Sequence, residues 1–379
     1  MKKYCFLFCI IMTLTFFIDH AAAKETAELI PFYFKDKMGY LNSALQIVIK
    51  PQLINYMNHI GSPHFTKEGF AVIYFDRGDS RGAAIITADS KIIYRLEQGF
   101  INHIYGDLYH IDDWSKNQKT KQEIIRLADK EIIANQTQYT GTASEDGYIL
   151  AEFFMEKKRY AFIDFEGNRV LQDLTMGKLS SSFFEQRAII CDENWQKRII
   201  DMDGNTIGNI QFKYLGQKFS EGLTPAWSID EQKGYINKHG EFEFLLINLF
   251  DNGWGNLKAT NFSGGYAAVK IKEKHDVWRI INTRGEMLSK DIYVTEMNDF
   301  FNGLSLVKVF NKELKKYTSG YVDIRGEFLI MPILEYADDF RNGYARIKYN
   351  GQDGLLKTNG KVIWSSNIMK GNIIEDEIR

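Results

Sequence analysis

Phe262-Ser-Gly-Gly265-Tyr-Ala-Ala-Val-Lys-Ile-Lys272 and Gly320-Tyr-Val-Asp-Ile-Arg-Gly326 are the two stretches that decide the fold. In the first, apolar and polar residues alternate after Gly265, as they do in a half-buried β-strand. The second is a short strand that ends in Asp-x-x-Gly, where the acid caps the backbone and the glycine takes a positive φ. The two stretches therefore predict two kinds of strand and a tight turn after the second.

Each stretch belongs to a series that recurs along the chain. The first series is an aromatic residue, two polar or small residues, a glycine and an apolar strand. It occurs at Phe219–Gly222, Phe262–Gly265, Phe300–Gly303 and Phe340–Gly343, with an altered copy at Phe65–Gly69, a copy without glycine at Phe183–Gln186, one without the ring at Gly147, and a degraded one near Gly106. From position 147 onward the glycine positions lie about 36 to 43 residues apart.

The second series is Gly-aromatic-aliphatic-Asp/Asn-x-x-Gly and follows each copy of the first. Clear copies begin at Gly234, Gly320 and Gly354, diverged copies at Ala161, Arg198 and Arg279, and weak copies at Gly39, near Ala84 and near Glu123. Because the turn glycine is common to the series, we predict a positive φ at Gly240, Gly326 and Gly360.

Nine repeats of about 40 residues account for residues 24–379. The first repeat is incomplete, and residues 94–138 are the most divergent stretch of the whole array. Three or four short strands per repeat and no helical period predict an all-β fold. A single repeat cannot bury its own face, so neighbours must share an aromatic core. We expect tandem antiparallel β repeats in a β-propeller-like ring; the alternative is an open superhelical β-hairpin solenoid.

The two series together resemble the bacterial WG-repeat (KWG repeat) proteins. The resemblance covers nearly all of residues 24–379 and is clearest from Phe219 to Trp364. The Trp-Gly dipeptide of that family is replaced at the repeat positions, for example by Ser319-Gly320, and Trp254-Gly255 is out of register. The resemblance implies a repeat scaffold with no assigned catalytic residues.

Residues 1–23 have the organisation of a signal peptide. Lys2 and Lys3 precede an apolar run from Tyr4 to Ile18 and the small residues Ala21-Ala22-Ala23. The run is shorter than the ~20 residues of a membrane-spanning helix, so we expect cleavage after Ala23, no integral membrane span and export to the periplasm or the extracellular space. Cleavage would leave Cys191 as the one cysteine and a net charge of -3.

No residue pattern predicts a catalytic, cofactor-binding or metal site. Cys191 lies in a predicted strand and is expected to pack there, not to react. His103 and His110 have no metal-ligand spacing, and Asp201-Met-Asp203-Gly204 repeats the turn motif instead of forming a calcium loop. Trp114, Trp195, Trp227 and Trp254 lie in or beside loops; for each one we favour a core position over a role as a binding anchor.

Composition narrows the function. A net charge of -2 and 25% charged residues argue against nucleic acid as a partner, and 45% hydrophobic residues with 14% aromatics are typical of a folded protein. We expect an exported, non-enzymatic scaffold that binds a protein or a glycan through its loops and faces. The alternatives are an enzyme that cleaves glycans or peptides with carboxylates, for which 94–138 is the candidate region, and a structural envelope component.

Overall fold

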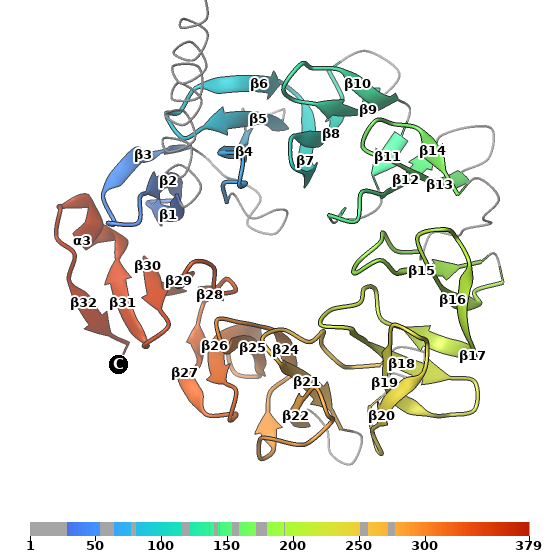
Figure 1. Ribbon diagram of the computed structural model, residues 1–379. Helices are drawn as coiled ribbons and strands as arrows, with labels where there is room; N and C mark the ends of the chain where they lie inside the picture. Colours follow the sequence, from blue (N-terminus) through green and yellow to red (C-terminus); the bar gives the residue numbers. More distant parts are fainter. Residues whose placement is uncertain are drawn as a thin grey trace, which may run out of the picture. The chain divides into compact units, whose positions relative to one another are not determined.

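In the computed structural model, the regular secondary structure of the described residues is almost entirely short antiparallel strands (Figure 1). It describes residues 29–53, 64–76, 81–115, 121–135, 137–139, 143, 145–153, 159–171, 180–192, 194–250, 257–271 and 277–378. The predicted signal peptide and Trp254 lie outside these residues. Within them no helix has the length and apolar character to cross a membrane.

Each of the nine second-series motifs forms a strand in the middle of a repeat, and we number the repeats by these strands. They are β2 (Lys37–Leu41), β5 (Arg81–Thr87), β9 (Lys121–Arg126), β13 (Arg159–Ile163), β16 (Lys197–Ile200), β19 (Lys233–Asn237), β22 (Val277–Asn282), β26 (Lys316–Asp323) and β30 (Gln352–Lys357), for repeats 1 to 9. The strand before each of them in its hairpin is β1 (Ile30–Phe34), β4 (Phe70–Asp76), β8 (Leu108–Asp113), β12 (Ile149–Phe153), β15 (Ala188–Cys191), β18 (Leu223–Ser228), β21 (Tyr266–Lys270), β25 (Leu304–Asn311) and β29 (Tyr344–Tyr349).

A third strand pairs with the other edge of the middle strand. These outer strands are β3 (Ile47–Leu53), β6 (Ile92–Leu96), β10 (Ile132–Asn135), β14 (Arg169–Val170), β17 (Thr206–Leu215), β20 (Phe242–Leu245), β23 (Ile292–Tyr293), β27 (Phe328–Leu334) and β31 (Lys361–Trp364). Four repeats have an added first strand: β7 (Gly99–Tyr105), β11 (Thr137–Tyr139), β24 (Glu296–Phe301) and β28 (Tyr336–Ala337). The chain ends with α3 (Ser365–Met369) and β32 (Glu375–Glu377), which pairs with β31.

The described strands form eight sheets, although there are nine repeats, because β17 joins two repeats. It pairs with β16 on one side and β18 on the other, so that repeats 5 and 6 share one six-stranded sheet. The chain also divides into two compact units. The smaller unit comprises residues 1–102, 112–120 and 366–373, and the larger unit comprises 103–111, 121–365 and 374–379.

Within the larger unit, the hydrophobic core lies between successive repeats. Phe262 of repeat 7 packs with Tyr235 of repeat 6, Phe300 of repeat 8 with Ile280 of repeat 7, and Phe340 of repeat 9 with Tyr321 of repeat 8. The recurring rings Phe219, Phe262, Phe300 and Phe340 are buried, and so is Phe183 in the copy without a glycine. The prediction of a shared aromatic core is therefore confirmed.

The turns are built as the sequence predicts. The φ angles of Gly240, Gly326 and Gly360 are 77°, 80° and 83°. In the turn of repeat 8 the Asp323 carboxylate accepts hydrogen bonds from the N–H groups of Arg325 and Glu327, both at 2.9 Å. The same pair of bonds forms at Asp164, Asp201, Asn237 and Asn282. Asp201 is thus a turn cap, as expected.

The all-β class with tandem antiparallel repeats is confirmed, with the character of propeller blades. Closure of the array into a ring stays a prediction.

Candidate functional site

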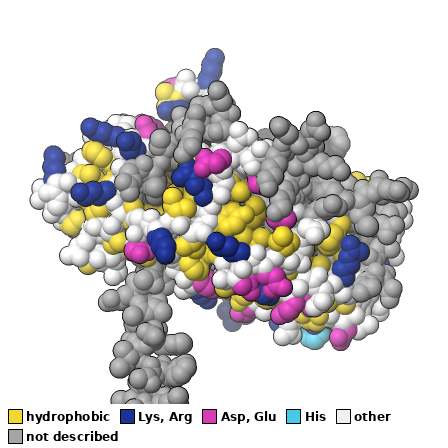
Figure 2. Space-filling view, turned by 90° about the horizontal axis from the view of Figure 1, so that it is seen from above, with side chains coloured by type: hydrophobic (Ala, Val, Ile, Leu, Met, Phe, Trp, Pro, Cys, Tyr) yellow, Lys and Arg dark blue, Asp and Glu magenta, His cyan; other side chains and the backbone are white. Residues whose placement is uncertain are grey.

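The outer strands of repeats 6, 7 and 8 carry large apolar side chains that face solvent. β20, β23 and β27 are each the last strand of their sheet. We call the exposed side chains on and beside these strands the outer apolar band: Leu245, Ile247, Met287, Leu288, Tyr293, Phe328, Met331 and Ile333. Ile247 and Tyr293 are 87% and 63% exposed. Figure 2 shows a different face of the molecule, on which hydrophobic side chains also lie between charged ones.

The turn glycines bring the outer strands of successive repeats together. A Cβ atom added at Gly285 of repeat 7 would lie 2.5 Å from the ring of Phe244 on β20. A Cβ atom at Gly326 of repeat 8 would lie 2.9 Å from the Ile292 Cδ1 on β23. Each turn therefore packs directly on the preceding outer strand, and the apolar positions of three repeats form a series.

The outer strand of repeat 9 differs, because the chain itself covers it. β32 pairs with β31 in an antiparallel register from Lys361↔Glu377 to Ile363↔Glu375, and Glu375 forms an ion pair with Lys357 at 2.6 Å. Exposed edge strands that are apolar readily add another strand, and natural proteins usually cover or charge them. Repeat 9 shows that this edge accepts an additional strand, whereas no strand of the described residues pairs with the outer edge of β20, β23 or β27.

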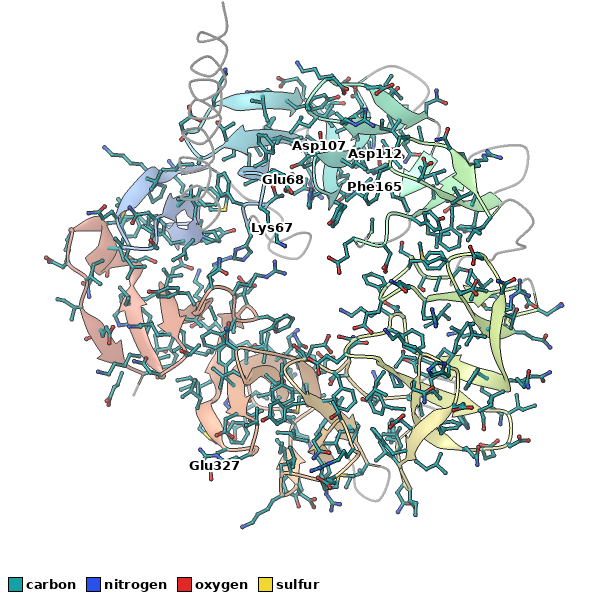
Figure 3. All side chains as sticks on the ribbon, viewed as in Figure 1. Lys67, Glu68, Asp107, Asp112, Phe165 and Glu327 are labelled. Atoms are coloured by element: carbon teal, nitrogen blue, oxygen red, sulfur yellow. The ribbon has the colours of Figure 1, made fainter. Side chains whose placement is uncertain are left out.

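Charged side chains border the band at the repeat 8 turn. Arg325 forms ion pairs with Asp323 at 2.9 Å and with Glu327 at 3.1 Å. Figure 3 shows Glu327 at the outer margin of this sheet, with its side chain pointing away from it. An apolar centre with a polar margin is the usual organisation of a protein interface.

The residues singled out by sequence reasoning lie elsewhere. Cys191 is buried in β15, and burial raises the pKa of its thiol, so it packs as predicted. His110 is buried in β8, and His103 Nε2 contacts the Gly106 carbonyl at 2.9 Å. In the described ranges of the chain no three His, Cys, Asp or Glu side chains are placed to hold a metal ion.

The loop tryptophans divide into three kinds. Trp227 is buried beside Lys233, which lies 4.3 Å from the centre of the ring, so the expected core position is right. Trp195 is 70% exposed, so the core prediction is wrong there; its φ of 64° and the hydrogen bond from its N–H to the Asp192 carbonyl place it in the tight turn between β15 and β16. Trp114 is partly exposed and packs edge to face on Phe100 at 4.8 Å.

One group of carboxylates comes together between repeats 7, 8 and 9. Asp299 accepts hydrogen bonds from the backbone and side chain of Asn261, at 2.9 and 3.1 Å, and Asp339 accepts one from Asn298 at 3.1 Å. Burial raises the pKa of Asp338 and of Asp339, while Tyr336 and Asn298 act in the opposite direction by hydrogen bonding. These contacts join neighbouring repeats and account for the carboxylates structurally.

Sequence reasoning missed the outer apolar band. The signal was present in Phe328-Leu-Ile-Met-Pro-Ile-Leu334, where both faces of a third strand are apolar. The strand itself was expected, but because both of its faces are apolar, the alternation of residues does not show which face a neighbouring repeat covers.

Comparison with known proteins supports the repeat assignment and the fold. The family model described as WG containing repeat matches residues 320–352, which form the second half of repeat 8 and the beginning of repeat 9. No curated protein matches the sequence.

Solved structures match this chain over much of its length. A crystal structure described as that of the eukaryotic initiation factor is 9% identical, with a TM-score of 0.53, and the match covers 88% of this chain and 93% of that one. BamB from Moraxella catarrhalis is 14% identical with a TM-score of 0.41, covering 78% and 96%. The C-terminal WD40 domain of Sif2 is 9% identical with a TM-score of 0.43, covering 76% and 91%. At these identities the likeness concerns the fold alone.

Proposed function

We propose that this WG-type repeat chain is an exported, non-enzymatic scaffold that binds a protein partner through the outer apolar band of repeats 6 to 8. The observation that carries the proposal is the band itself: three consecutive edge strands expose large apolar side chains. Clusters of exposed apolar side chains on soluble proteins often mark sites that another molecule covers.

The chemistry of the band favours protein over glycan. Its members are mostly aliphatic, with Leu245, Ile247, Leu288, Met331 and Ile333 among them. A glycan would bury hydroxyl groups that need hydrogen-bond partners, whereas most side chains of the outer apolar band carry no hydrogen-bonding group. An extended peptide segment, in contrast, can pair with an edge strand and place alternate side chains on it.

Two further features support the proposal. The sequence at residues 1–23 favours export, and the buried Cys191 gives no exposed thiol that would need a reducing compartment. The carboxylates that gather in repeats 7 to 9 are engaged in hydrogen bonds between repeats, which favours a structural role over acid–base catalysis.

Site-specific crosslinking in the native cell tests the proposal. A photoreactive residue at position 331 or 293 should give one discrete adduct with a protein, and the same residue at Trp195 should not. The partner identified in this way is then titrated with the purified chain. Met331→Asp with Ile333→Asp should weaken its binding at least tenfold while leaving the melting temperature unchanged. Equal affinity of the variant and the wild type would refute the proposal.

A further inference from the structure

The hairpin of repeat 8 is longer than its counterpart in repeat 9. β25 and β26 form eight pairs, from Leu304↔Asp323 to Asn311↔Lys316, whereas β29 and β30 form six and end at Tyr349↔Gln352. Beyond the equivalent pairs at Gly320 and Gly354, the repeat 8 hairpin has four further pairs and the repeat 9 hairpin has two. At about 3.4 Å per residue, the repeat 8 hairpin therefore extends roughly 7 Å further than the repeat 9 hairpin, and a four-residue turn closes it.

The additional residues are apolar and basic. We call residues 310–317, Phe-Asn-Lys-Glu-Leu-Lys-Lys-Tyr, the repeat 8 tip. Phe310, Leu314 and Tyr317 are 43%, 58% and 47% exposed, and the two rings pack edge to face at 5.2 Å. Three exposed lysines and one glutamate give the tip a charge of +2, although the whole chain is at -2.

The tip has a defined conformation. The Asn311 side chain accepts hydrogen bonds from the N–H groups of Glu313 and Leu314, both at 3.0 Å, and Lys315 has a φ of 50°. At the base of the tip the Phe310 N–H donates to the Thr295 hydroxyl at 3.2 Å. The structure therefore holds three apolar side chains in solvent without giving them a role in the core.

We propose that the repeat 8 tip docks on an anionic phospholipid surface. Phe310, Leu314 and Tyr317 would enter the interface, and Lys312, Lys315 and Lys316 would lie at the lipid headgroups. The extension of roughly 7 Å matches the 5–10 Å to which apolar side chains enter the boundary between headgroups and acyl chains. Aromatic rings and lysines are the residues that prefer this region.

The shape of the tip argues against a protein as its occupant. A stable protein interface buries about 800 Å² on each partner. The tip is the end of a two-stranded hairpin and has only eight residues, so it offers less surface than such an interface needs. Insertion into a membrane does not require a large complementary surface, because lipids rearrange around the inserted side chains. The inference goes beyond the proposed function and does not depend on the outer apolar band.

Vesicle flotation with the full chain tests the inference. Vesicles of phosphatidylcholine alone are compared with vesicles that contain about 30% phosphatidylglycerol. The wild type should float with the anionic vesicles and lose binding as salt is raised. Each lysine near an anionic surface contributes about fivefold to partitioning, so Lys312→Gln, Lys315→Gln and Lys316→Gln together should weaken binding about 100-fold. The matched control changes three exposed lysines elsewhere to Gln together, namely Lys258, Lys290 and Lys361, and should retain binding.

A second variant separates the tip from the rest of repeat 8. Replacing residues 310–317 with Asn-Gly gives repeat 8 the short turn that repeat 9 has at Asn350-Gly351. This variant should keep the wild-type circular dichroism and melting temperature and lose vesicle binding. Binding by the shortened variant as strong as that of the wild type would overturn the inference, and so would equal binding to neutral and anionic vesicles. Binding to poly-glutamate but not to vesicles would also overturn it, in favour of an acidic polypeptide.

Discussion

The ring of Tyr321 lies 5.0 Å from the ring of Phe340, edge to face, and the Tyr321 hydroxyl donates a hydrogen bond of 2.6 Å to the Asp338 carbonyl. Tyr235 has the same relationship with Phe262, at 4.9 Å, and with the Thr260 carbonyl, at 2.6 Å. The aromatic residue of each of these second-series motifs thus forms part of the socket for the ring that opens the next repeat. The two sequence motifs, which are separate in the sequence, therefore pack against each other at the contact between successive repeats.

Truncation of a recurring ring should cost stability between repeats. Phe300 is buried between repeats 7 and 8, and we expect Phe300→Ala to lower the free energy of unfolding by about 3–5 kcal/mol. Phe310→Ala, at an exposed ring, should change it by less than about 1 kcal/mol. Chemical denaturation of both variants measures the difference, and a similar small loss at both sites would contradict the interface we describe.

Hydrogen exchange on the same variant addresses the closure of the array. In an open stack with nearest-neighbour coupling, Phe300→Ala should lower protection in repeats 7 and 8 and spare repeat 4. In the closed ring that we expect, protection should fall in all repeats together. Small-angle scattering provides an independent measure, because an open stack has a longer maximum dimension than a ring of the same mass. A long maximum dimension together with local loss of protection would show the open solenoid.

Two turn glycines should differ in their sensitivity to alanine. Gly303 and Gly326 have φ angles of 75° and 80°, so both variants carry the cost of an L-residue in this region, about 1–2 kcal/mol. A Cβ atom at Gly303 meets open space, whereas one at Gly326 would lie 2.9 Å from Ile292 Cδ1. Gly326→Ala should therefore destabilise the protein more than Gly303→Ala in thermal melts. Equal losses would show that repeats 7 and 8 are not in direct contact here.

A carboxylate of repeat 5 should hold the first turn of repeat 6. Glu185 accepts hydrogen bonds from the Glu221 and Gly222 N–H groups, at 2.7 and 2.8 Å. Glutamine retains one acceptor oxygen and loses the charge, so Glu185→Gln should cost about 1 kcal/mol. The control is Glu241→Gln, at an exposed glutamate in another turn. Faster exchange of the Gly222 amide in the first variant alone would establish the contact; identical exchange in both variants would argue against it.

Asp338 should make stability depend on pH. Burial raises the pKa of Asp338 above its ordinary value of 3.8, so the folded state binds this proton more tightly than the unfolded chain. The contribution of this group to stability therefore rises as pH falls through the raised pKa and is lost as pH increases. Asp338→Asn should be more stable than the wild type at pH 7, and the difference should shrink on acidification. Denaturation at pH 7 and pH 4 measures it; a less stable variant at pH 7 would refute the assignment.

Export should leave a defined N-terminus. If residues 1–23 are a cleaved signal peptide, the protein recovered from its native cell should begin at Lys24, or within two residues of it. Mass spectrometry of the N-terminal peptide measures this directly. Recovery of a chain that begins at Met1 from the membrane fraction would contradict cleavage.

The sequence by itself determined the repeat, the strands and the turns. Gly and Asp/Asn at fixed spacing impose the turn conformations, and the buried side of each strand follows from alternation, because these are properties of local backbone and of the chain's own pattern. The turn of repeat 5 keeps the conformation of its counterparts even though it has no glycine, because Glu185 and Gln186 adopt φ angles of 54° and 65°.

Only the tertiary structure decided where the repeats meet and which apolar side chains remain uncovered. The outer strands of repeats 8 and 9 both end in apolar residues, yet β31 is covered by β32, whereas no strand within the described ranges covers β27. Likewise, Tyr317 and Tyr321 lie on one strand, but Tyr321 is buried against Phe340 while Tyr317 projects beyond the neighbouring hairpin. Alternation along a strand fixes the face on which a side chain lies, whereas its burial depends on how far the next repeat extends across that face.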